Sequence, residues 1–189
     1  MEFCPLAIPE IILVTPKQLI DDRGFFEETW NQKLWEKSGI TGNFVQDNRS
    51  LSTHAFTVRG LHFQTPPHAQ AKLVRVSKGK ILDVAVDIRV GSPSFGQHVF
   101  VILDAKTAQQ LWIPAGFAHG FCTLEPDTEV QYKVTDFYSH ENDAGIKWND
   151  PALNIDWHIP KGSTASVSKK DEKSPLLADI PTSFQFGEF

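Results

Sequence analysis

Residues 80–89 read Lys-Ile-Leu-Asp-Val-Ala-Val-Asp-Ile-Arg, a short apolar run that lies between Gly79 and Gly91. Runs of this length that are rich in Val and Ile and end at glycine are typical of strands. Similar runs follow at intervals of roughly ten residues, at 97–103, 110–113, 120–124 and 128–135. Turn signals made of Gly and Pro separate them. The sequence therefore predicts an all-β fold, an antiparallel sandwich or jelly roll.

The chain of 189 residues suits one domain with a single core. Its hydrophobic content of 41% and charged content of 22% argue against a disordered or coiled-coil protein. One short helix is expected at residues 31–38, with Asn31 as its N-cap and Gly39 at its end. The chain opens on no signal-peptide pattern, and its apolar runs are far shorter than a membrane span. We therefore expect no membrane partner.

A basic stretch lies in the middle of an acidic chain. The formal net charge is −5, yet residues 49–82 contain six Lys or Arg, three His and no carboxylate. Either these charges lie on solvated strand faces or some of them bind a small anion, and composition alone does not decide between the two. The acidic charge of the whole chain argues against a nucleic-acid partner. The two cysteines, Cys4 and Cys122, suggest neither a disulfide framework nor a zinc site, which favours the cytoplasm.

Residues 59–64, Arg-Gly-Leu-His-Phe-Gln, lie inside this basic stretch. In a regular strand, Gly60 and His62 would share one face, and Arg59 and Leu61 would share the other. A single histidine is more often structural than catalytic, so the motif needs support from other residues.

Lys72 and Tyr132 give that support. Lys72 begins another apolar run, and Tyr132 alternates with two valines on a later strand, so both side chains can point into the same barrel as His62. Burying these polar groups costs several kcal/mol unless hydrogen bonds or a ligand compensate. The pattern predicts a binding or catalytic site inside the barrel.

Residues 113–120, Ile-Pro-Ala-Gly-Phe-Ala-His-Gly, place His119 at the start of a strand, directly after a turn. The spacing Pro-x-Gly-x-x-His resembles the second motif of the cupin superfamily, whose small jelly-roll barrels bind metals or sugars. A metal-binding cupin would also have a His-x-His pair, whereas His62 is followed by Phe63 and Gln64. The residues therefore do not favour a metal site.

The motifs taken in order resemble one family over residues 8–177, the dTDP-4-dehydrorhamnose 3,5-epimerases of the cupin superfamily. The motifs are Asp22-Arg-Gly-Phe-Phe-Glu27, Phe44-Val-Gln-Asp-Asn48, Arg59-Gly-Leu-His-Phe-Gln64, Ala69-Gln-Ala-Lys-Leu-Val-Arg75, Asp83-Val-Ala-Val-Asp-Ile-Arg89, Ser92-Pro-Ser-Phe-Gly96, Leu111-Trp-Ile-Pro-Ala-Gly-Phe-Ala-His-Gly-Phe121, Lys147-Trp-Asn-Asp150 and Ser168-Lys-Lys-Asp171. The resemblance implies a cupin-type antiparallel jelly-roll barrel with a few short peripheral helices.

The same resemblance implies an isomerase of dTDP-L-rhamnose biosynthesis that inverts carbons 3 and 5 of a dTDP-linked 4-keto-6-deoxyhexose. Both carbons flank the ketone, so each proton can leave to form an enolate and return on the opposite face. This chemistry needs a base, an acid and a positive group near the oxyanion, and no metal or redox cofactor is expected.

The resemblance also implies a role for each site residue. His62 is the base, and Asp171, far along the chain, orients it. Lys72 stabilises the enolate, and Tyr132 is the acid on the far face once a nearby cation moderates its pKa. The contacts to the nucleotide and the sugar fall on Arg23, Gln46, Asn48, Arg59, His119, Lys170 and Tyr138, with Tyr138 stacking on thymine. The other cations of the basic stretch, Arg49, Arg75, Lys78 and Lys80, are expected to be solvated.

We expect residues 1–189 to form one epimerase domain that assembles as a homodimer. Segment 1–30 would be exchanged at the dimer interface, where Phe25 and Glu28 would reach the neighbouring subunit's site. Segment 161–189 would close over the site. On composition alone, however, residues 161–175 are polar and would be a flexible surface linker.

Three other functions stay open. A single-centre epimerase of a dTDP-4-keto-6-deoxysugar would keep the same base and acid, so the sequence does not exclude it. A non-catalytic cupin that binds a sugar nucleotide would need neither group. A metal-dependent cupin oxygenase would be revealed by metal in the purified protein.

Overall fold

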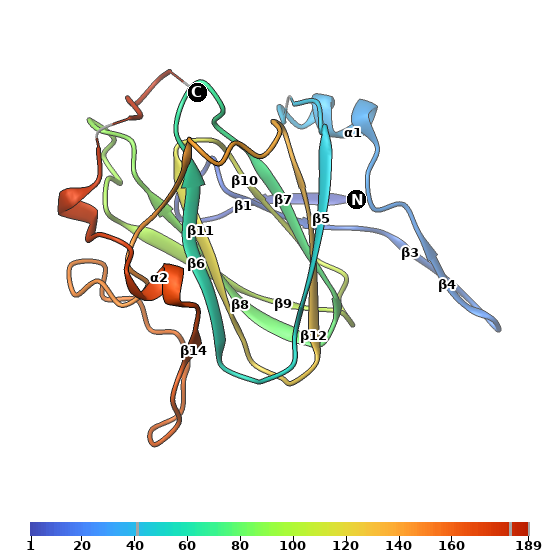
Figure 1. Cartoon of the computed structure of the whole chain (residues 1–189). Coiled ribbons are helices and arrows are strands. Elements are labelled where there is room, and N and C mark those ends of the chain that lie inside the picture. The colour runs from blue at the N-terminus through green and yellow to red at the C-terminus, as the bar shows by residue number, and fades with distance from the viewer. Residues whose placement is uncertain (41, 182, 189) are drawn as a thin grey trace.

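Two sheets face each other across the core of the computed structural model, which describes residues 1–40, 42–181 and 183–188 (Figure 1). The first sheet has the strand order β1 (Glu2–Pro5), β2 (Ile12–Thr15), β10 (Gln110–Ile113), β7 (Lys72–Lys78), β12 (Thr128–Val134), β5 (Gln46–Ser52). The second has the order β13 (Asp143–Gly145), β6 (Thr57–Gln64), β11 (Phe117–Thr123), β8 (Lys80–Asp87), β9 (His98–Asp104), and β14 (Ser166–Val167) pairs with β6. All of these pairs are antiparallel except β14 with β6. The expected antiparallel jelly-roll barrel is confirmed.

Strand β8 explains why residues 80–89 are apolar almost throughout. Its odd-numbered aliphatic residues, such as Ile81, belong to a cluster inside the barrel, whereas Leu82, Val84 and Val86 belong to a second cluster on the outer face. The outer cluster includes Trp157 and other residues of the C-terminal half of the chain. Because both faces of β8 are covered, alternation with polar residues is not required.

The expected helix is present as α1 (Gln32–Lys37). The Asn31 side chain accepts a hydrogen bond from the Leu34 N–H group, as an N-cap does. Trp35 on this helix is fully buried and packs in an aromatic cluster with Trp30 and Trp112. Through this cluster, α1 packs against the outer face of the first sheet.

The predicted runs of residues correspond to β8, β9, β10, β11 and β12, with small differences at their ends. Strand β11 begins at Phe117, three positions earlier than expected, because Phe117 packs inside the barrel. Strand β8 ends at Asp87, whose carboxylate accepts hydrogen bonds from the backbone and side chain of Arg89.

The interpretation of residues 161–175 as a flexible surface linker is wrong. This segment contains β14, which pairs with β6, and α2 (Lys169–Glu172). The Ser168 hydroxyl accepts the Asp171 N–H group at 3.1 Å and caps α2, and Asp171 itself is buried. A short 3₁₀ helix, η1 (Leu177–Asp179), follows.

A hairpin of β3 (Gln18–Asp21) and β4 (Gly24–Glu27) projects from the barrel (Figure 1). Four of its apolar side chains are more than half exposed: Leu19, Ile20, Phe25 and Phe26. By contrast, β1 pairs with β2, and β2 pairs with β10, all within the same chain. The projecting part of segment 1–30 is therefore the hairpin.

The part of the chain that the structure describes contains no helix long and apolar enough to cross a membrane.

Candidate functional site

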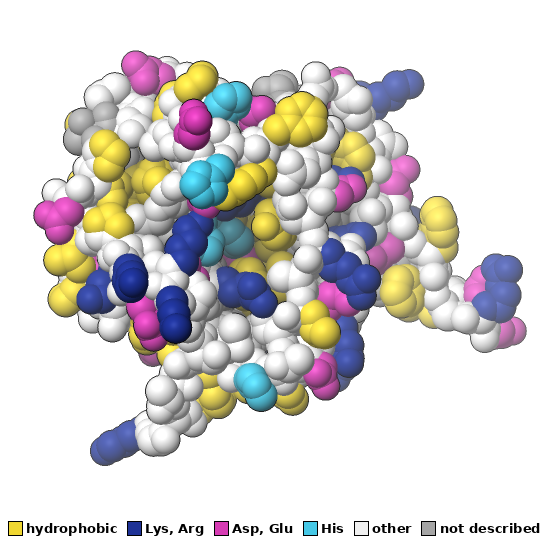
Figure 2. All heavy atoms as spheres, in the orientation of Figure 1, with side chains coloured by type: hydrophobic (Ala, Val, Ile, Leu, Met, Phe, Trp, Pro, Cys, Tyr) yellow, Lys and Arg dark blue, Asp and Glu magenta, His cyan; other side chains and the backbone are white. Residues whose placement is uncertain are grey.

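A cavity of about 440 Å³ lies between the two sheets and is bordered by the segment of β14 and α2. Its walls carry His62, Lys72, His119 and Tyr132 from four different strands, and Asp171 from α2. Figure 2 shows a hollow in this face of the molecule, with Lys, Arg and His side chains gathered around it. The structure thus brings the expected base, acid, lysine and carboxylate into one cavity.

His62 and Asp171 form a close pair. His62 Nε2 lies 2.7 Å from Asp171 Oδ1, and the Gly60 N–H group donates to Asp171 Oδ2 at 3.3 Å. Burial alone would raise the pKa of Asp171, but the hydrogen bond and the attraction of His62, together with the hydrogen bonds of Gly60 and Ser168, outweigh it and the pKa is lowered. An ionised Asp171 accepts the Nε2–H proton and leaves the lone pair of Nδ1 free. His62 is therefore in the tautomer that a base needs.

The expected division of faces on β6 is wrong. Arg59 and His62 both line the cavity, whereas Leu61 packs in the outer apolar cluster. The register of β6 against β11 shifts at this point. The irregularity centres on Gly60, which has φ 122°, and a Cβ atom there would lie 2.6 Å from Gly120 Cα. Only glycine fits this close approach, which turns Arg59 toward the same side as His62.

Lys72 is a buried ammonium group on β7, with an exposed fraction of 8%. Its Nζ atom donates to the backbone oxygen of His62 at 3.2 Å. Burial lowers the pKa of Lys72 to about 8, although attraction by Asp83 and Asp143 works in the opposite direction. The group is a weakly solvated cation that is still protonated near neutral pH.

Tyr132 lies on β12, in the sheet opposite the one that carries His62. Burial raises the pKa of its phenol above the usual range. The expected nearby cation is Arg59, which lowers the pKa but does not cancel the effect of burial. The phenol is therefore protonated at neutral pH and can donate a proton.

His119 faces Asp83 within the barrel. Its Nε2 atom lies 3.0 Å from Asp83 Oδ1, and both residues are buried. Burial lowers the pKa of His119, while Asp83 partly opposes this shift.

A second pocket of about 310 Å³ shares His62, Lys72 and Tyr132 with the first and extends toward Tyr138. The Tyr138 hydroxyl donates to Asp143 Oδ2 at 3.0 Å, and Lys170 forms an ion pair with the same oxygen. The remaining expected nucleotide contacts of this region, Gln46 and Asn48, also line it.

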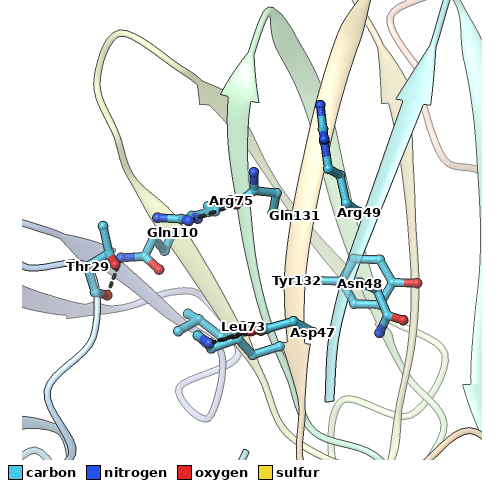
Figure 3. Close-up of a pocket in the computed structure, with 10 residues that line it drawn as sticks. Thr29, Asp47, Asn48, Arg49, Leu73, Arg75, Gln110, Gln131 and Tyr132 are labelled. Atoms are coloured by element: carbon cyan, nitrogen blue, oxygen red, sulfur yellow. Dashed lines mark hydrogen bonds and ion pairs between the residues drawn. The ribbon is translucent and has the colours of Figure 1, made fainter.

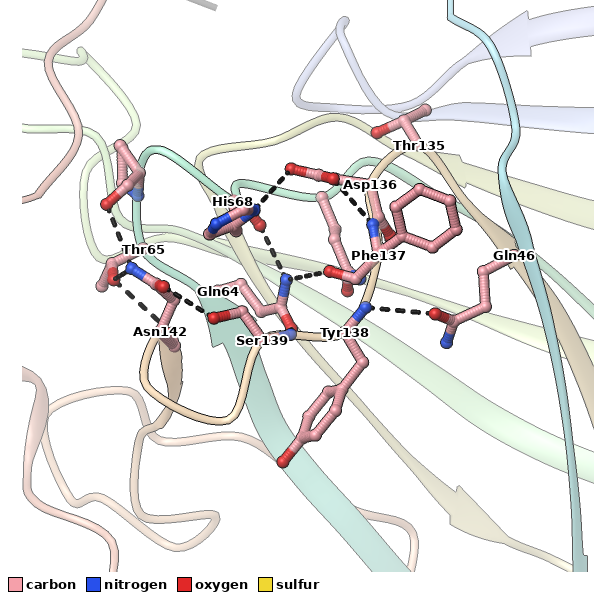
Figure 4. A network of polar contacts seen from close by, with 12 residues as sticks. Gln46, Gln64, Thr65, His68, Thr135, Asp136, Phe137, Tyr138, Ser139 and Asn142 are labelled. Atoms are coloured by element: carbon pink, nitrogen blue, oxygen red, sulfur yellow. Dashed lines mark hydrogen bonds and ion pairs between the residues drawn. The ribbon is translucent and has the colours of Figure 1, made fainter.

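The turn that carries Tyr138 is held by a polar network (Figure 4). Gln64 donates to the backbone oxygens of His68 and Phe137 and accepts the Ser139 N–H group. The Tyr138 N–H group donates to Gln46 Oε1 at 3.1 Å. Gln64 belongs to the same strand as His62. The network therefore fixes the turn of Tyr138 relative to the strand that carries the expected base.

Three expected site residues lie away from these pockets within one chain. Arg23 and Phe25 belong to the projecting hairpin, and Glu28 follows it. The Arg23 side chain is 90% exposed and pairs with Asp21 of the same hairpin.

The cations expected to be solvated lie outside the cavity. Arg49 pairs with Glu129, and Arg75 donates to Gln131 at 2.7 Å. Both line a separate hollow of about 190 Å³ on the outer face of the first sheet (Figure 3). Lys78 is exposed and Lys80 pairs with Asp104, and neither lines the cavity. The basic stretch thus divides between the two faces of the sheets.

Sequence reasoning missed three polar residues near the site: Ser50, Asp83 and Asp143. The signal for Asp83 was available, because it interrupts the inward positions of a strand that is otherwise apolar. Ser50 and Asp143 carry no such signal. The Ser50 hydroxyl is buried and has no hydrogen-bond partner among the described residues.

Within residues 1–40, 42–181 and 183–188, no cluster of three or more His, Cys, Asp or Glu is placed to hold a metal ion. The chain itself offers no geometry for metal ligation in this part.

Comparisons with known proteins agree closely over nearly the whole chain. The family model of dTDP-4-dehydrorhamnose 3,5-epimerases matches residues 5–179. A protein of that name from Sinorhizobium fredii is 50% identical over 186 residues, which cover 98% of this chain and 94% of that protein.

Two solved structures are similar in fold as well as in sequence. A dTDP-6-deoxy-D-glucose-3,5-epimerase from Legionella pneumophila, in complex with dTDP-4-keto-L-rhamnose, has a TM-score of 0.93 and 42% identity, covering 98% of each chain. A dTDP-4-dehydrorhamnose 3,5-epimerase from Bacillus anthracis, with TDP and PPi bound, has a TM-score of 0.89 and 47% identity, covering 93% of this chain and 98% of that one.

Proposed function

The chain belongs to the dTDP-4-dehydrorhamnose 3,5-epimerase family, and from this premise we propose how its own residues carry out the reaction. The enzyme is an isomerase that converts dTDP-4-dehydro-6-deoxy-glucose into dTDP-4-dehydro-L-rhamnose by inverting carbons 3 and 5. This reaction is a step of dTDP-L-rhamnose biosynthesis.

His62 removes the proton from the carbon next to the ketone. The lone pair of its Nδ1 atom is free to accept that proton, because Nε2–H is donated to Asp171 at 2.7 Å. The resulting imidazolium is stabilised by the same carboxylate, which stays ionised.

Lys72 stabilises the enolate oxygen that forms as the proton leaves. A buried ammonium interacts strongly with a developing negative charge, because little water screens the two groups. Its hydrogen bond to the His62 backbone oxygen couples the position of the cation to the strand of the base.

Tyr132 returns a proton from the opposite side. Base and acid come from opposite sheets and line one cavity, which is the observation that carries this proposal. Removal from one face and return to the other inverts the carbon, and leaves His62 protonated and Tyr132 ionised. Once His62 has released its proton to solvent and solvent has reprotonated Tyr132, the same pair can act at the second carbon that flanks the ketone. The roles of base, cation and acid account for every polar group that the reaction requires.

The nucleotide occupies the outer part of the site. Arg59 and Lys170 are cations suited to the pyrophosphate, with Arg59 able to bind phosphate oxygens in pairs. Gln46 and Asn48 offer hydrogen bonds to the nucleoside, and Tyr138, which is 57% exposed, is free to stack on thymine.

Proton exchange tests the function directly. The purified enzyme is incubated with dTDP-4-keto-6-deoxyglucose in deuterated water, and we expect deuterium at both carbon 3 and carbon 5. Deuterium at neither carbon would refute the function, and deuterium at one carbon only would identify a single-centre epimerase. His62→Ala is expected to abolish the exchange, whereas the matched control His54→Ala, at an exposed histidine away from the cavity, should keep it.

The assembly belongs to the same proposal. The exposed apolar side chains of the β3–β4 hairpin are suited to burial against a second copy, which would carry Arg23, Phe25 and Glu28 to the neighbouring site. Sedimentation tests this: Phe25→Asp combined with Phe26→Asp should give a monomer, and Phe95→Asp, at an exposed phenylalanine elsewhere, should remain a dimer. A double variant that stayed dimeric would refute the interface.

The same proposal includes closure of the site by the C-terminal segment and a cytoplasmic location. Residues of β14 and α2 already border the cavity, which supports the first. The free thiols of Cys4 and Cys122 are compatible with a reducing compartment, which supports the second.

A further inference from the structure

Asp83 is a buried carboxylate to which the proposed reaction gives no role. It lies on β8 at an inward position between Ile81 and Ala85, both members of the apolar cluster inside the barrel. Its exposed fraction is 0%. Among the described residues, the one side chain that hydrogen-bonds to it is His119, whose Nε2 lies 3.0 Å from Oδ1 and 3.1 Å from Oδ2.

Packing does not explain this carboxylate. Taking a charged group out of water is costly, and replacing a buried ionic pair with apolar side chains often stabilises a fold. A valine or isoleucine at position 83 would continue the inner face of β8 without that cost. A role in the cavity explains why an aspartate stands there.

We propose that Asp83 is a positioning residue whose carboxylate holds the ring of His119 in one orientation and one tautomer, and provides the negative charge that balances the Lys72 ammonium group. This inference rests on the proposed function, because it assigns Asp83 a part in the same reaction.

The contact with Asp83 leaves the second ring nitrogen of His119, Nδ1, available to a ligand. Because the carboxylate accepts the Nε2–H proton, Nδ1 carries the lone pair, and Nδ1 makes no hydrogen bond within the described residues. Burial lowers the pKa of this histidine, so the ring is neutral at neutral pH. Nδ1 is then a hydrogen-bond acceptor. It suits a hydroxyl group of the sugar, whereas the ketone oxygen is left to the Lys72 ammonium group.

Asp83 also stabilises the charged form of Lys72. The titratable groups that face it come from five strands: His62 on β6, Asp83 on β8, His119 on β11, Tyr132 on β12 and Asp143 on β13. Arg59, Lys170 and Asp171 line the same cavity. Of these carboxylates, Asp143 already pairs with Lys170, and Asp171 with His62. Asp83 pairs only with the His119 ring among the described residues, and its attraction raises the pKa of Lys72 against the effect of burial.

The variant Asp83→Asn tests the proposal in the full-length enzyme, because asparagine keeps the size and removes the charge. We expect kcat to fall by about 10²-fold, as displaced catalytic groups do, with a smaller change in KM. We also expect the alkaline limb of the pH profile to move by about one unit toward lower pH, because Lys72 loses a proton more easily. The matched control Asp156→Asn, at an exposed position, should change neither.

An unchanged pH profile and kcat in a folded Asp83→Asn enzyme would overturn the proposal. Nitrogen-15 NMR of the His119 ring in the wild-type enzyme gives a second test that needs no folded variant. A proton on Nε2 is expected, and a proton on Nδ1 alone would overturn the assignment. A wild-type enzyme without any deuterium exchange would refute the proposed function instead, and the ring measurement would still decide on the Asp83–His119 pair.

Discussion

Replacing Asp171 with asparagine should disable the base while leaving the barrel intact. The carboxylate accepts a charge-assisted hydrogen bond from His62 at 2.7 Å, which becomes an ion pair once the ring takes up a proton. Hydrogen bonds to charged groups contribute about 1.5–3 kcal/mol. Loss of that stabilisation in the transition state alone corresponds to a fall in kcat of roughly 10- to 150-fold, at 1.36 kcal/mol for each factor of ten.

The tautomer adds to this loss. An asparagine amide can donate to Nε2, which would move the ring proton to Nδ1 and remove the lone pair that takes the substrate proton. We therefore expect Asp171→Asn to lower kcat by at least about 10²-fold, with the larger loss following from the wrong tautomer.

The assay is the rate of deuterium incorporation at carbons 3 and 5, measured at saturating substrate. The control is Glu172→Gln, which removes a neighbouring, exposed carboxylate of the same short helix. Circular dichroism and thermal unfolding establish that both variants are folded. If Asp171→Asn kept the rate within threefold of the wild type, the pairing would not serve the base and the reasoning would fail.

Activity should fall as pH rises through about 8, because the ammonium form of Lys72 acts on the enolate, and a pH series of kcat checks it. The free energy of unfolding should change in the opposite direction. Between pH values of about 8 and 10.5 the unfolded chain binds more protons at Lys72 than the folded chain does, so raising the pH favours the folded state. Tyr132→Phe should keep wash-out of substrate protons but slow product formation by roughly 10²- to 10⁴-fold, which NMR of the sugar protons measures, and normal product formation would contradict the role of the phenol. Gly60→Ala should lower the free energy of unfolding by about 1–3 kcal/mol, because the new Cβ would lie 2.6 Å from the Gly120 Cα atom. Gly162 also has a positive φ, but a Cβ atom there would meet nothing within 4 Å. In urea unfolding, Gly162→Ala should therefore lose less stability than Gly60→Ala.

The strands of the barrel could be predicted because their signals are local. Val- and Ile-rich runs bounded by Gly and Pro led to β8–β12, and the cap at Asn31 led to α1. The structure of the polar segment 161–175 could not be predicted in this way, because contacts with residues distant in the sequence hold it in place. Strand β14 pairs with β6, and Asp171 is buried against His62, neither of which a local pattern contains.

The site divides in the same way. His62, Lys72 and Tyr132 could be placed in one lumen by strand alternation, and they do line one cavity. Alternation failed for Arg59, because the irregularity at Gly60 inserts a residue into the register of β6. A bulge depends on the neighbouring strand, so a single strand's sequence carries no reliable sign of it.

The hydrogen bond between His62 and Asp171 joins two residues that are 109 positions apart. During synthesis on a ribosome, the carboxylate that orients the base therefore emerges 109 residues after the base itself. Closing so long a loop is slow compared with forming local hairpins. A nascent chain can therefore complete most of its barrel while it still lacks a competent base, and the onset of activity marks the docking of the segment that contains β14 and α2 rather than the formation of the core.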